Sequence, residues 1–400
     1  MSERKVKMKN SFEKYRADEN NLNWENIIKR EKPLYERNND LRSEFGRDYT
    51  RIIHSTAYRR LKHKTQVYFS PENDHICTRI EHVVHVESIS YTIANYLGLN
   101  TELTKAIATA HDIGHSPFGH EGEKILSKIS LRDIGKTFWH EKNGLDFVDN
   151  VEILEDNKKI FQNLNLTYAV RDGIISHCGE IDENALKPRK EAIDLSNYTK
   201  PNEYAPYTWE GCVVKIADKI SYLGRDIEDA ITMGILDEHL NELYKVLDAK
   251  SDKTINNTVI INDLVFDLCN NSSPEKGLCF SDEMFNKINK LKKFNYKYIY
   301  MSDELKPCVE YYNIVLNRIY DTLKASFNNK EYFKEKYPEL INDFYDWFNI
   351  YSNKDRNEKY KNKILFDEKN EKDFYQAIIY YIAGMTDNYA VKMYESIVKF

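Results

Sequence analysis

The chain of 400 residues contains little glycine and little proline, 14 and 9 respectively. These residues form most turns and interrupt most helices, so their scarcity argues against a fold built from many short strands. Apolar residues instead recur at intervals of three and four through most of the sequence, which is the period of one helix face. We therefore expect an all-α protein.

Paired cysteine motifs and long apolar runs are also missing. The six cysteines are Cys77, Cys178, Cys212, Cys269, Cys279 and Cys308. None are spaced as C-x-x-C, which argues against a zinc ribbon or a disulfide framework and favours reduced, mostly buried thiols in a cytoplasmic protein. No apolar run approaches the roughly 18 residues of a membrane span, and the basic residues after Met1 lack the apolar segment of a secretory signal.

Positive charge is not in excess, because the formal net charge is -6. This argues mildly against a dedicated nucleic-acid binder, although a global sum hides local fields. One local cluster consists of Arg42, Arg47, Arg51, Arg59, Arg60, Lys62 and Lys64. Its density suits a polyanionic substrate, and a solvated helix face is the alternative.

Apolar periodicity locates the expected helices. They span residues 80–98, 102–112, 211–230, 234–249, 281–298, 305–327, 331–351 and 371–398, and another begins near His120. Aromatic residues in the later helices are expected to form core or subunit contacts. Along the chain we expect an N-terminal arm and leading helix at 1–41, a core at 42–235 and a helical C-terminal region at 236–400.

Four residues on three of these helices form a ligand set for one divalent cation. His82 lies on the first helix, His111 and Asp112 end the second, and Asp218 lies on the helix over 211–230. Two imidazoles with two carboxylates suit Mn, Fe, Co or Zn better than Ca and leave positions open for water and a substrate oxygen. Such an ion acidifies its water and polarises a phosphoryl oxygen, so the set predicts hydrolysis. Taken singly, each residue has a structural role as the alternative.

Further histidines follow the metal pair closely enough to face the same cavity. His115, His120 and Glu123 lie in this segment, and Glu123 can orient the His120 ring or raise its pKa to make a general acid or base. His140 is another candidate, with a structural role as the alternative. The histidines interpreted as structural or surface residues are His54, His63, His75, His85, His177 and His239.

Side chains suited to phosphate and sugar flank the metal ligands. Lys219 places a cation beside Asp218, and Tyr222 and Asp226 follow one and two turns later, where they can hydrogen-bond or stack on a sugar. Arg79 precedes His82 by one helical turn and can also reach a phosphate.

The motifs that carry these residues resemble those of the HD-domain deoxynucleoside triphosphate triphosphohydrolases of the bacterial deoxyguanosine triphosphatase group. They are RSEFGRDYTRIIHSTAYRRLKHKTQVY from Arg42, TRIEH ending at His82, HDIGHSPFGHEGE from His111, DKISYLGRD from Asp218 and GMTDNYA from Gly384. The resemblance is strong over residues 42–230 and weaker over 375–398. Glu81 departs from the small hydroxyl residue that many bacterial members have before the first histidine, which leaves the branch and base preference open.

This resemblance implies an all-α HD-domain helical core, at 42–235, with a helical C-terminal extension. It implies hydrolysis of deoxynucleoside triphosphates, dGTP or a broader set, at the α-phosphorus to give a deoxynucleoside and inorganic triphosphate. One divalent ion (Mn, Fe, Mg, Co or Zn) would be held by His82, His111, Asp112 and Asp218, and additional Mg with the triphosphate is left open.

Roles for the other candidates also come from the resemblance. His115, His120, Glu123 and His140 would surround the reacting phosphorus. Arg79 and Lys219 would grip the triphosphate. Tyr222 and Asp226 would contact the sugar near its 3′-hydroxyl, with Tyr222 rejecting a ribose, and Arg59 would approach the base or sugar edge.

Two other classes remain as alternatives. One is an HD-type phosphohydrolase acting on a nucleoside monophosphate or cyclic nucleotide, against which Lys219 and Arg79 favour a longer phosphate chain. The other is a non-catalytic sensor of nucleotides or single-stranded nucleic acid, against which the His120 and Glu123 pair favours catalysis. The family commonly assembles into rings or stacked oligomers, so we expect a homo-oligomer. Regulation by an allosteric dNTP and weak binding of single-stranded nucleic acid are left open.

Overall fold

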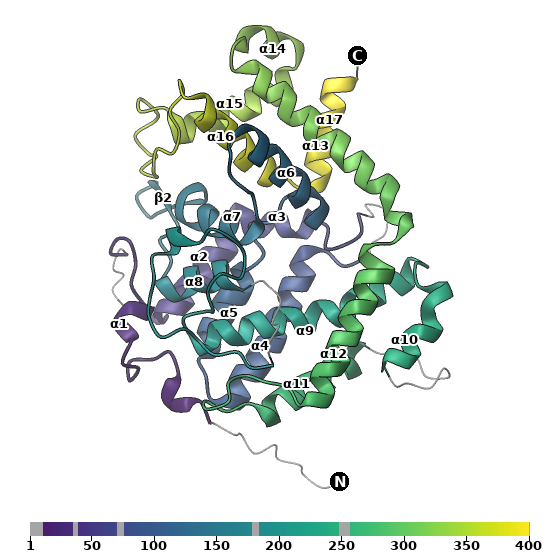
Figure 1. The fold of residues 1–400 in the computed structure, drawn as a ribbon. Coiled ribbons are helices and arrows are strands. Elements are labelled where there is room, and N and C mark those ends of the chain that lie inside the picture. Colours follow the sequence, from purple (N-terminus) through teal and green to yellow (C-terminus); the bar gives the residue numbers. More distant parts are fainter. Residues whose placement is uncertain (1–10, 35–38, 70–75, 178–183, 248–256, 400) are drawn as a thin grey trace. The chain divides into compact units, whose positions relative to one another are not determined.

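The computed structural model describes residues 11–34, 39–69, 76–177, 184–247 and 257–399 (Figure 1). The regular structure is almost entirely helical, which confirms the expected all-α class. The helices are α1 Trp24–Ile27, α2 Glu44–His54, α3 Thr56–Arg60, α4 Arg79–Leu97, α5 Thr101–Ala110, α6 Gly119–Asp133, α7 His140–Asp146, α8 Tyr168–Ser176, α9 Trp209–Thr232, α10 Leu240–Leu247, α11 Asn257–Asn271, α12 Asp282–Asn295, α13 Lys306–Ser326, α14 Lys330–Lys336, α15 Pro338–Ser352, α16 Glu371–Ala383 and α17 Asp387–Val398.

A single small hairpin is the only sheet among the described residues. Its strands β1 (Ile153–Glu155) and β2 (Phe161–Asn163) pair antiparallel, with Leu154 opposite Gln162. Single turns of 3-10 helix lie at Glu13–Tyr15, Leu61–His63, Leu195–Asn197, Asp237–His239 and Asp303–Leu305, and π-helical turns at Phe147–Val151 and Tyr296–Tyr300.

Side-chain caps begin the helices that carry the candidate residues. The Asn100 side chain accepts hydrogen bonds from the amides of Glu102 and Leu103 at the start of α5, and Thr208 accepts one from the Gly211 amide at the start of α9. Each cap satisfies amides that have no partner within the helix. The expected helices over 80–98, 102–112 and 211–230 are therefore observed with ends shifted by one or two residues.

Two expected helices are each divided in two, so their prediction as single helices was wrong. The helix expected over 331–351 is α14 and α15, because Pro338 begins α15 and has no amide hydrogen with which to continue α14. The helix expected over 371–398 is α16 and α17, because Thr386 has an extended backbone and caps α17 through the Tyr389 amide.

The chain forms two compact units, each assembled from separated segments. Unit 1 comprises Met1–Thr50, His82–His111 and Leu166–Asp303, and unit 2 comprises Arg51–Glu81, Asp112–Asn165 and Glu304–Phe400. The sequence division at residues 41 and 235 runs along the chain instead, and it stays a prediction.

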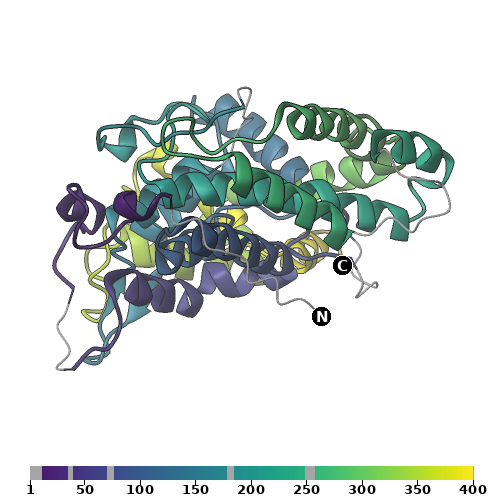
Figure 2. The same ribbon diagram turned by 90° about the horizontal axis from the view of Figure 1, so that it is seen from below.

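In unit 1, α9 packs against α5, α8, α11 and α12, and Figure 2 shows this group from below. The predicted inner stripe of α9 is buried, and its members are Val213, Ala217, Ile220, Gly224 and Ile227. Helices α5 and α8 approach closely at Gly173, where a Cβ would lie 2.6 Å from the Ile107 side chain. Unit 1 is thus centred on α9, the helix that carries Asp218.

In unit 2, α13 packs against α6, α16 and α17. The aromatic residues of α15 and α16 form much of its core. The ring of Phe344 lies 5.7 Å from that of Phe348 and 5.4 Å from that of Phe374, between centroids. The expectation that aromatic residues in this region form core is met at these three positions.

The described cysteines differ in how deeply they are buried. Cys77, Cys212 and Cys269 are buried, Cys279 is partly exposed and Cys308 is exposed. Cys178 and His75 lie outside the described residues. Within the described part of the chain, no helix has both the length and the apolar character needed to cross a membrane.

Candidate active site

Three of the four predicted metal ligands come together in unit 1. His82 extends from α4, His111 follows the last residue of α5, and Asp218 extends from α9. The Nε2 atoms of His82 and His111 face each other at 3.4 Å, and Oδ1 of Asp218 lies 2.9 Å from the first and 3.8 Å from the second. The two histidines are buried. This group offers two nitrogens and one oxygen to a common cation.

The donor atoms of this group are those that a transition metal requires. Nδ1 of His111 donates a hydrogen bond to the Ala108 carbonyl at 2.6 Å, which fixes the ring and leaves the Nε2 lone pair for a cation. All three ligand atoms lie within 4.8 Å of one another. Two imidazole nitrogens and a carboxylate oxygen suit Zn, Mn, Fe or Co, and the cluster therefore fits a divalent metal.

His177 lies beside this cluster, although the sequence interpretation treated it as structural. Its ring packs edge-on against that of His111, with centroids 5.0 Å apart, and its Nδ1 bonds the Ile174 carbonyl at 2.7 Å. Both histidines follow the last residue of a helix and bond the carbonyl three residues earlier. That shared position at a helix end is the one sequence signal that could have singled out His177.

The fourth predicted ligand, Asp112, belongs to unit 2, where it begins the segment Asp112–Asn165. There Oδ2 accepts a hydrogen bond from Nη1 of Arg79 at 2.7 Å, and Oδ1 lies 3.1 Å from Nε2 of His115. The same guanidinium donates to the carbonyls of Thr65 and Gln66. Arg79 is buried. Its observed contacts thus orient Asp112, and its predicted contact with a phosphate stays a prediction.

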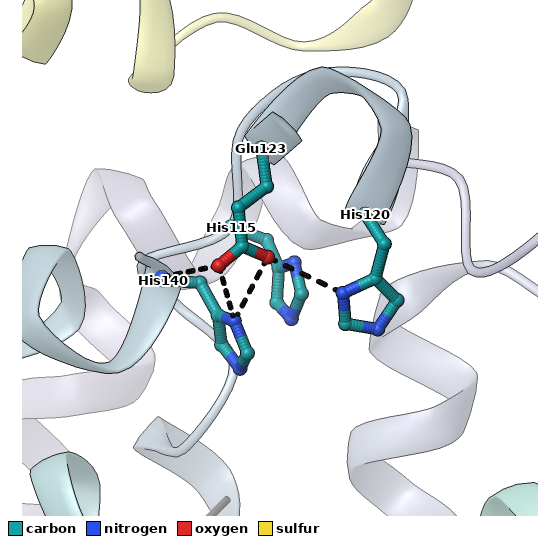
Figure 3. Close-up of side chains that lie close together, drawn as sticks. All are labelled: His115, His120, Glu123 and His140. Atoms are coloured by element: carbon teal, nitrogen blue, oxygen red, sulfur yellow. Dashed lines mark hydrogen bonds and ion pairs between the residues drawn. The ribbon is translucent and has the colours of Figure 1, made fainter. Parts of the chain in front are cut away.

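The predicted acid–base residues form a second cluster, wholly within unit 2. Figure 3 shows the Glu123 carboxylate between the rings of His120 and His140. Nδ1 of His120 lies 3.2 Å from Oε2 of Glu123, and Nδ1 of His140 lies 3.2 and 3.1 Å from its two oxygens. The backbone amide of His140 also donates to Oε1 at 3.0 Å. One carboxylate therefore orients two imidazoles.

His115 completes this cluster by stacking on His140. The two rings are nearly parallel, with centroids 3.9 Å apart. Burial, with the nearby positive charges of Arg79 and His140, holds the pKa of His115 well below its usual value, so this ring is neutral at neutral pH. Its Nδ1 is buried without a hydrogen-bond partner among the described residues.

The charge of Glu123 is stabilised by the rings around it. Burial alone would raise the pKa of this carboxyl, but the charge of His140 and the hydrogen bonds from His120 and His140 outweigh it. The pKa of Glu123 is therefore held well below its usual range. An ionised Glu123 can accept hydrogen bonds from both imidazoles and so hold both rings in a fixed orientation.

Close backbone packing places the loop that carries His115. A Cβ on Gly114 would lie 2.1 Å from the His140 carbonyl oxygen, and one on Gly122 would lie 1.8 Å from the Pro117 carbonyl oxygen. Phe118, just before α6, has a φ of 61°, a conformation uncommon outside glycine. The loop can follow this path only because side chains are absent at Gly114 and Gly122.

The predicted sugar and phosphate residues of α9 all belong to unit 1. Lys219 and Asp226 are buried and Tyr222 is half-buried. Oδ2 of Asp226 accepts a hydrogen bond from the Tyr300 hydroxyl at 2.5 Å. Tyr300 lies in a π-helical turn that the sequence interpretation did not single out, and its 74-residue separation from Asp226 leaves no local signal.

Several side chains of the basic segment over 42–64, which the sequence indicated as a site for a polyanion, form contacts within the protein. Arg42 pairs with Asp40 at 2.8 Å, Arg60 with Glu152 at 3.2 Å, and Arg51 donates to the Leu164 carbonyl. Arg59 is exposed on α3. Its predicted contact with a base or sugar edge stays a prediction, as does nucleic-acid binding by this segment.

Two family models match parts of the chain, and several known proteins are similar to most of it. A model of the HD domain matches residues 79–223, and a model described as a phosphohydrolase-associated domain matches residues 328–396. Similar proteins include one from Caldanaerobacter subterraneus subsp. tengcongensis, 34% identical over 90% of this chain and 86% of its own. Others are from Clostridium tetani, 33% identical over 91% and 88%, and Desulfatibacillum aliphaticivorans, 32% identical over 89% and 88%. All three are named deoxyguanosinetriphosphate triphosphohydrolase-like protein.

Proposed function

The chain belongs to the family of deoxyguanosinetriphosphate triphosphohydrolase-like proteins, which are hydrolases with an HD domain, and we propose that it hydrolyses deoxynucleoside triphosphates to a deoxynucleoside and inorganic triphosphate. The observation that carries this proposal is the cluster of His82, His111 and Asp218, whose ligand atoms lie within 4.8 Å of one another. Such a cluster supports chemistry on a phosphoryl group, since a bound divalent ion acidifies water and neutralises charge on phosphate oxygens.

We assign the metal to His82, His111 and Asp218, with Asp112 as the fourth ligand. Hydrogen bonds hold two of these residues in position. The Ala108 carbonyl fixes the His111 ring, and Arg79 fixes the Asp112 carboxylate. Such supporting contacts keep ligands in the geometry that the ion requires.

In this proposal, proton transfer and hydrogen bonding at the reacting phosphorus come from the second cluster, formed by His115, His120, Glu123 and His140. When water adds to the α-phosphorus and the bond to O5′ breaks, the departing deoxynucleoside oxygen requires a proton. His120, which is exposed and bonded to ionised Glu123, is suited to donate it as a general acid. Neutral His115 retains an unpartnered Nδ1 that is suited to a substrate hydrogen bond.

Substrate contacts in this proposal come from α9. Lys219 supplies a cation for the triphosphate. Tyr222 and Asp226 supply a ring and a carboxylate for the deoxyribose, and the hydrogen bond from Tyr300 fixes the orientation of Asp226. A tyrosine packed near C2′ would leave no room for a ribose hydroxyl, so we propose discrimination against ribonucleotides.

The test is a substrate panel. The purified protein is incubated with each dNTP, alone and in pairs, with Mn or Mg, and the products are separated by ion chromatography. We expect triphosphate and deoxynucleoside in equal amounts, and paired substrates also test for activation by a second dNTP. Asp218→Asn should abolish the reaction, whereas Glu228→Gln, an exposed position on the same helix, should retain it. Release of pyrophosphate or single phosphates, or no hydrolysis by the metal-loaded protein, would refute the proposal.

A further inference from the structure

The loop between His115 and Phe118 is held at both ends by buried charged side chains that lie outside the catalytic cluster. One is Lys64, which follows the turn Leu61–His63, and the other is Asp387, the first residue of α17. Both are almost completely buried, with 2% and 3% of their surface exposed. All of these residues belong to unit 2.

Asp387 holds the Phe118 end of the loop. Its Oδ1 accepts a hydrogen bond from the Phe118 amide at 2.9 Å, and its Oδ2 accepts one from the Thr65 amide at 2.7 Å and another from the Thr65 hydroxyl. Phe118 has the left-handed backbone noted above, and α6 begins at the next residue with His120 in its first turn. This carboxylate therefore fixes the backbone from which the His120 side chain extends.

Lys64 holds the His115 end of the loop. Its ammonium group donates hydrogen bonds to the carbonyl oxygens of His115 and Ala383, the second at 2.8 Å. Ala383 ends α16, so Lys64 and Asp387 join the catalytic loop to both sides of the turn between α16 and α17. The joined residues are more than 260 positions apart in the chain.

Stability alone is a weak reason for two buried charges at this place. Burial lowers the pKa of Lys64 to about 7 and raises that of Asp387, which shows that each charge is held at a cost. Well-packed apolar residues usually serve stability as well or better. What the charged pair adds is directional bonding to the backbone of His115 and Phe118.

We propose that Asp387, together with Lys64, is a positioning residue: the turn between α16 and α17 fixes the catalytic loop so that His115 and His120 keep their geometry relative to Glu123 and His140. Neither Asp387 nor Lys64 touches the side chains of that cluster in the contacts described. The role of the loop in hydrolysis rests on the proposed function. The hydrogen bonds by which Lys64 and Asp387 hold the loop form a clamp, and this clamp is a property of the fold.

The main test variant is Asp387→Asn, because asparagine cannot accept hydrogen bonds from the Phe118 amide and the Thr65 amide with separate atoms. Unit 1 offers a matched control in Asp48. Its buried carboxylate accepts hydrogen bonds from the Thr167 amide at 2.8 Å and the Thr167 hydroxyl at 2.7 Å, which is the arrangement that Asp387 makes with Thr65. Asp48→Asn should destabilise the protein in a similar way without touching the loop.

Kinetics separate positioning from general stability. At a temperature where all variants are folded by circular dichroism, Asp387→Asn should lower kcat on the order of 10- to 100-fold, because small displacements of catalytic groups have effects of this size. Its KM should stay within about threefold, and Asp48→Asn should retain the wild-type kcat within about twofold. Lys64→Met, which cannot donate to the loop, is the second variant and should follow Asp387→Asn.

Hydrogen exchange tests the clamp without hydrolysis. By mass spectrometry, the peptide over residues 113–122 should exchange about tenfold faster in Asp387→Asn than in the wild type and remain unchanged in Asp48→Asn. Equal exchange in the wild type and Asp387→Asn, or an equal fall in kcat for Asp387→Asn and Asp48→Asn, would overturn the inference. If the wild type releases no triphosphate, the proposed function fails, yet the exchange measurement still decides whether the clamp exists.

Discussion

The histidines of the candidate site use Nδ1 for two different purposes. His111 bonds a backbone carbonyl through this atom and leaves Nε2 facing the neighbouring metal ligands. His120 and His140 instead direct Nδ1 at the Glu123 carboxylate, which can exchange a hydrogen bond with each ring. The bond at Nδ1 thus distinguishes a histidine suited to bind a cation from one suited to transfer a proton.

Replacement of Glu123 should impair proton transfer and leave cation binding intact. In Glu123→Gln, both imidazoles lose their charged partner, and we expect kcat to fall on the order of 100-fold. Metal content, measured by mass spectrometry of the purified protein, should stay at the wild-type level because the ligands are other residues. Glu121→Gln is the control, since Glu121 lies on the same helix and pairs with Lys124 at 2.5 Å, outside the cluster. Loss of metal in Glu123→Gln would contradict this assignment.

Lys64 should make the stability of the protein depend on pH. Because burial lowers its folded pKa to about 7, the unfolded chain binds a proton between pH 7 and the usual value of 10.5 that the folded chain does not. Stability should therefore rise with pH across this window, by at most about 3 kcal/mol between pH 7 and 9.5, and not below it. Urea unfolding of the wild type and Lys64→Met at pH 6.5 and 9.5 measures the difference. The same change in the free energy of unfolding with pH in both proteins would contradict a lowered pKa of Lys64.

At the scale of elements, the site depends on how closely helices approach. α5 delivers His111 and packs against α8 at Gly173, where a Cβ would lie within 2.7 Å of three carbons of Ile107. Such a contact allows no side chain without moving one helix. The close approach of α5 and α8 therefore depends on the absence of a Cβ at Gly173.

Gly173→Ala should for this reason lower the free energy of unfolding by about 1–3 kcal/mol, the usual cost of overpacking. Gly46→Ala is the matched control, because it also lies in a helix but its Cβ would meet no atom closer than 3.4 Å. That variant should be as stable as the wild type or gain up to about 1 kcal/mol from the helix preference of alanine. Thermal and urea denaturation provide the values, and equal stability of the two variants would contradict the packing argument.

Sequence patterns predicted the elements whose signals are local. α4, α5 and α9 were expected nearly at their observed bounds, since apolar periodicity and capping residues lie within each segment. The interruption at Pro338 was also a local signal, but the amphipathic pattern on either side of it concealed the break. The left-handed turn at Phe118 was not predictable, because Asp387, which stabilises it, is 269 residues away.

The candidate site likewise contains some contacts that the sequence could predict and others that it could not. The pairing of His120 with Glu123 follows from a spacing of three residues on a helix, and the structure confirms that contact. The stacking of His115 on His140 and the hydrogen bond of Tyr300 to Asp226 depend on tertiary packing, for which spacing carries no information. Residue types thus indicated the chemistry, whereas the hydrogen-bond partners required the fold.

At the scale of the whole molecule, each compact unit carries one of the two clusters. Unit 1 holds His82, His111 and Asp218, and unit 2 holds the cluster around Glu123. The boundary between the units falls between His111 and Asp112, within the motif predicted to bind the metal. A metal bound by His82, His111 and Asp218 should therefore stabilise unit 1.

We expect Mn to raise the stability of the wild type by about 2.7 kcal/mol when its free concentration is 100 times its dissociation constant. A chelator should reverse this gain and abolish hydrolysis. Asp218→Asn should lose the gain, and Glu228→Gln, exposed on the same helix, should keep it. Thermal unfolding with and without Mn measures the effect, and an equal shift in the two variants would place the metal elsewhere.

The most direct test of the central claim is to follow oxygen from water into the products. The enzyme is incubated with a dNTP and Mn in H₂¹⁸O, and both products are analysed by mass spectrometry. Attack of water on the α-phosphorus predicts one ¹⁸O atom in the inorganic triphosphate and none in the deoxynucleoside. A label in the deoxynucleoside, or products other than triphosphate, would contradict the proposed reaction.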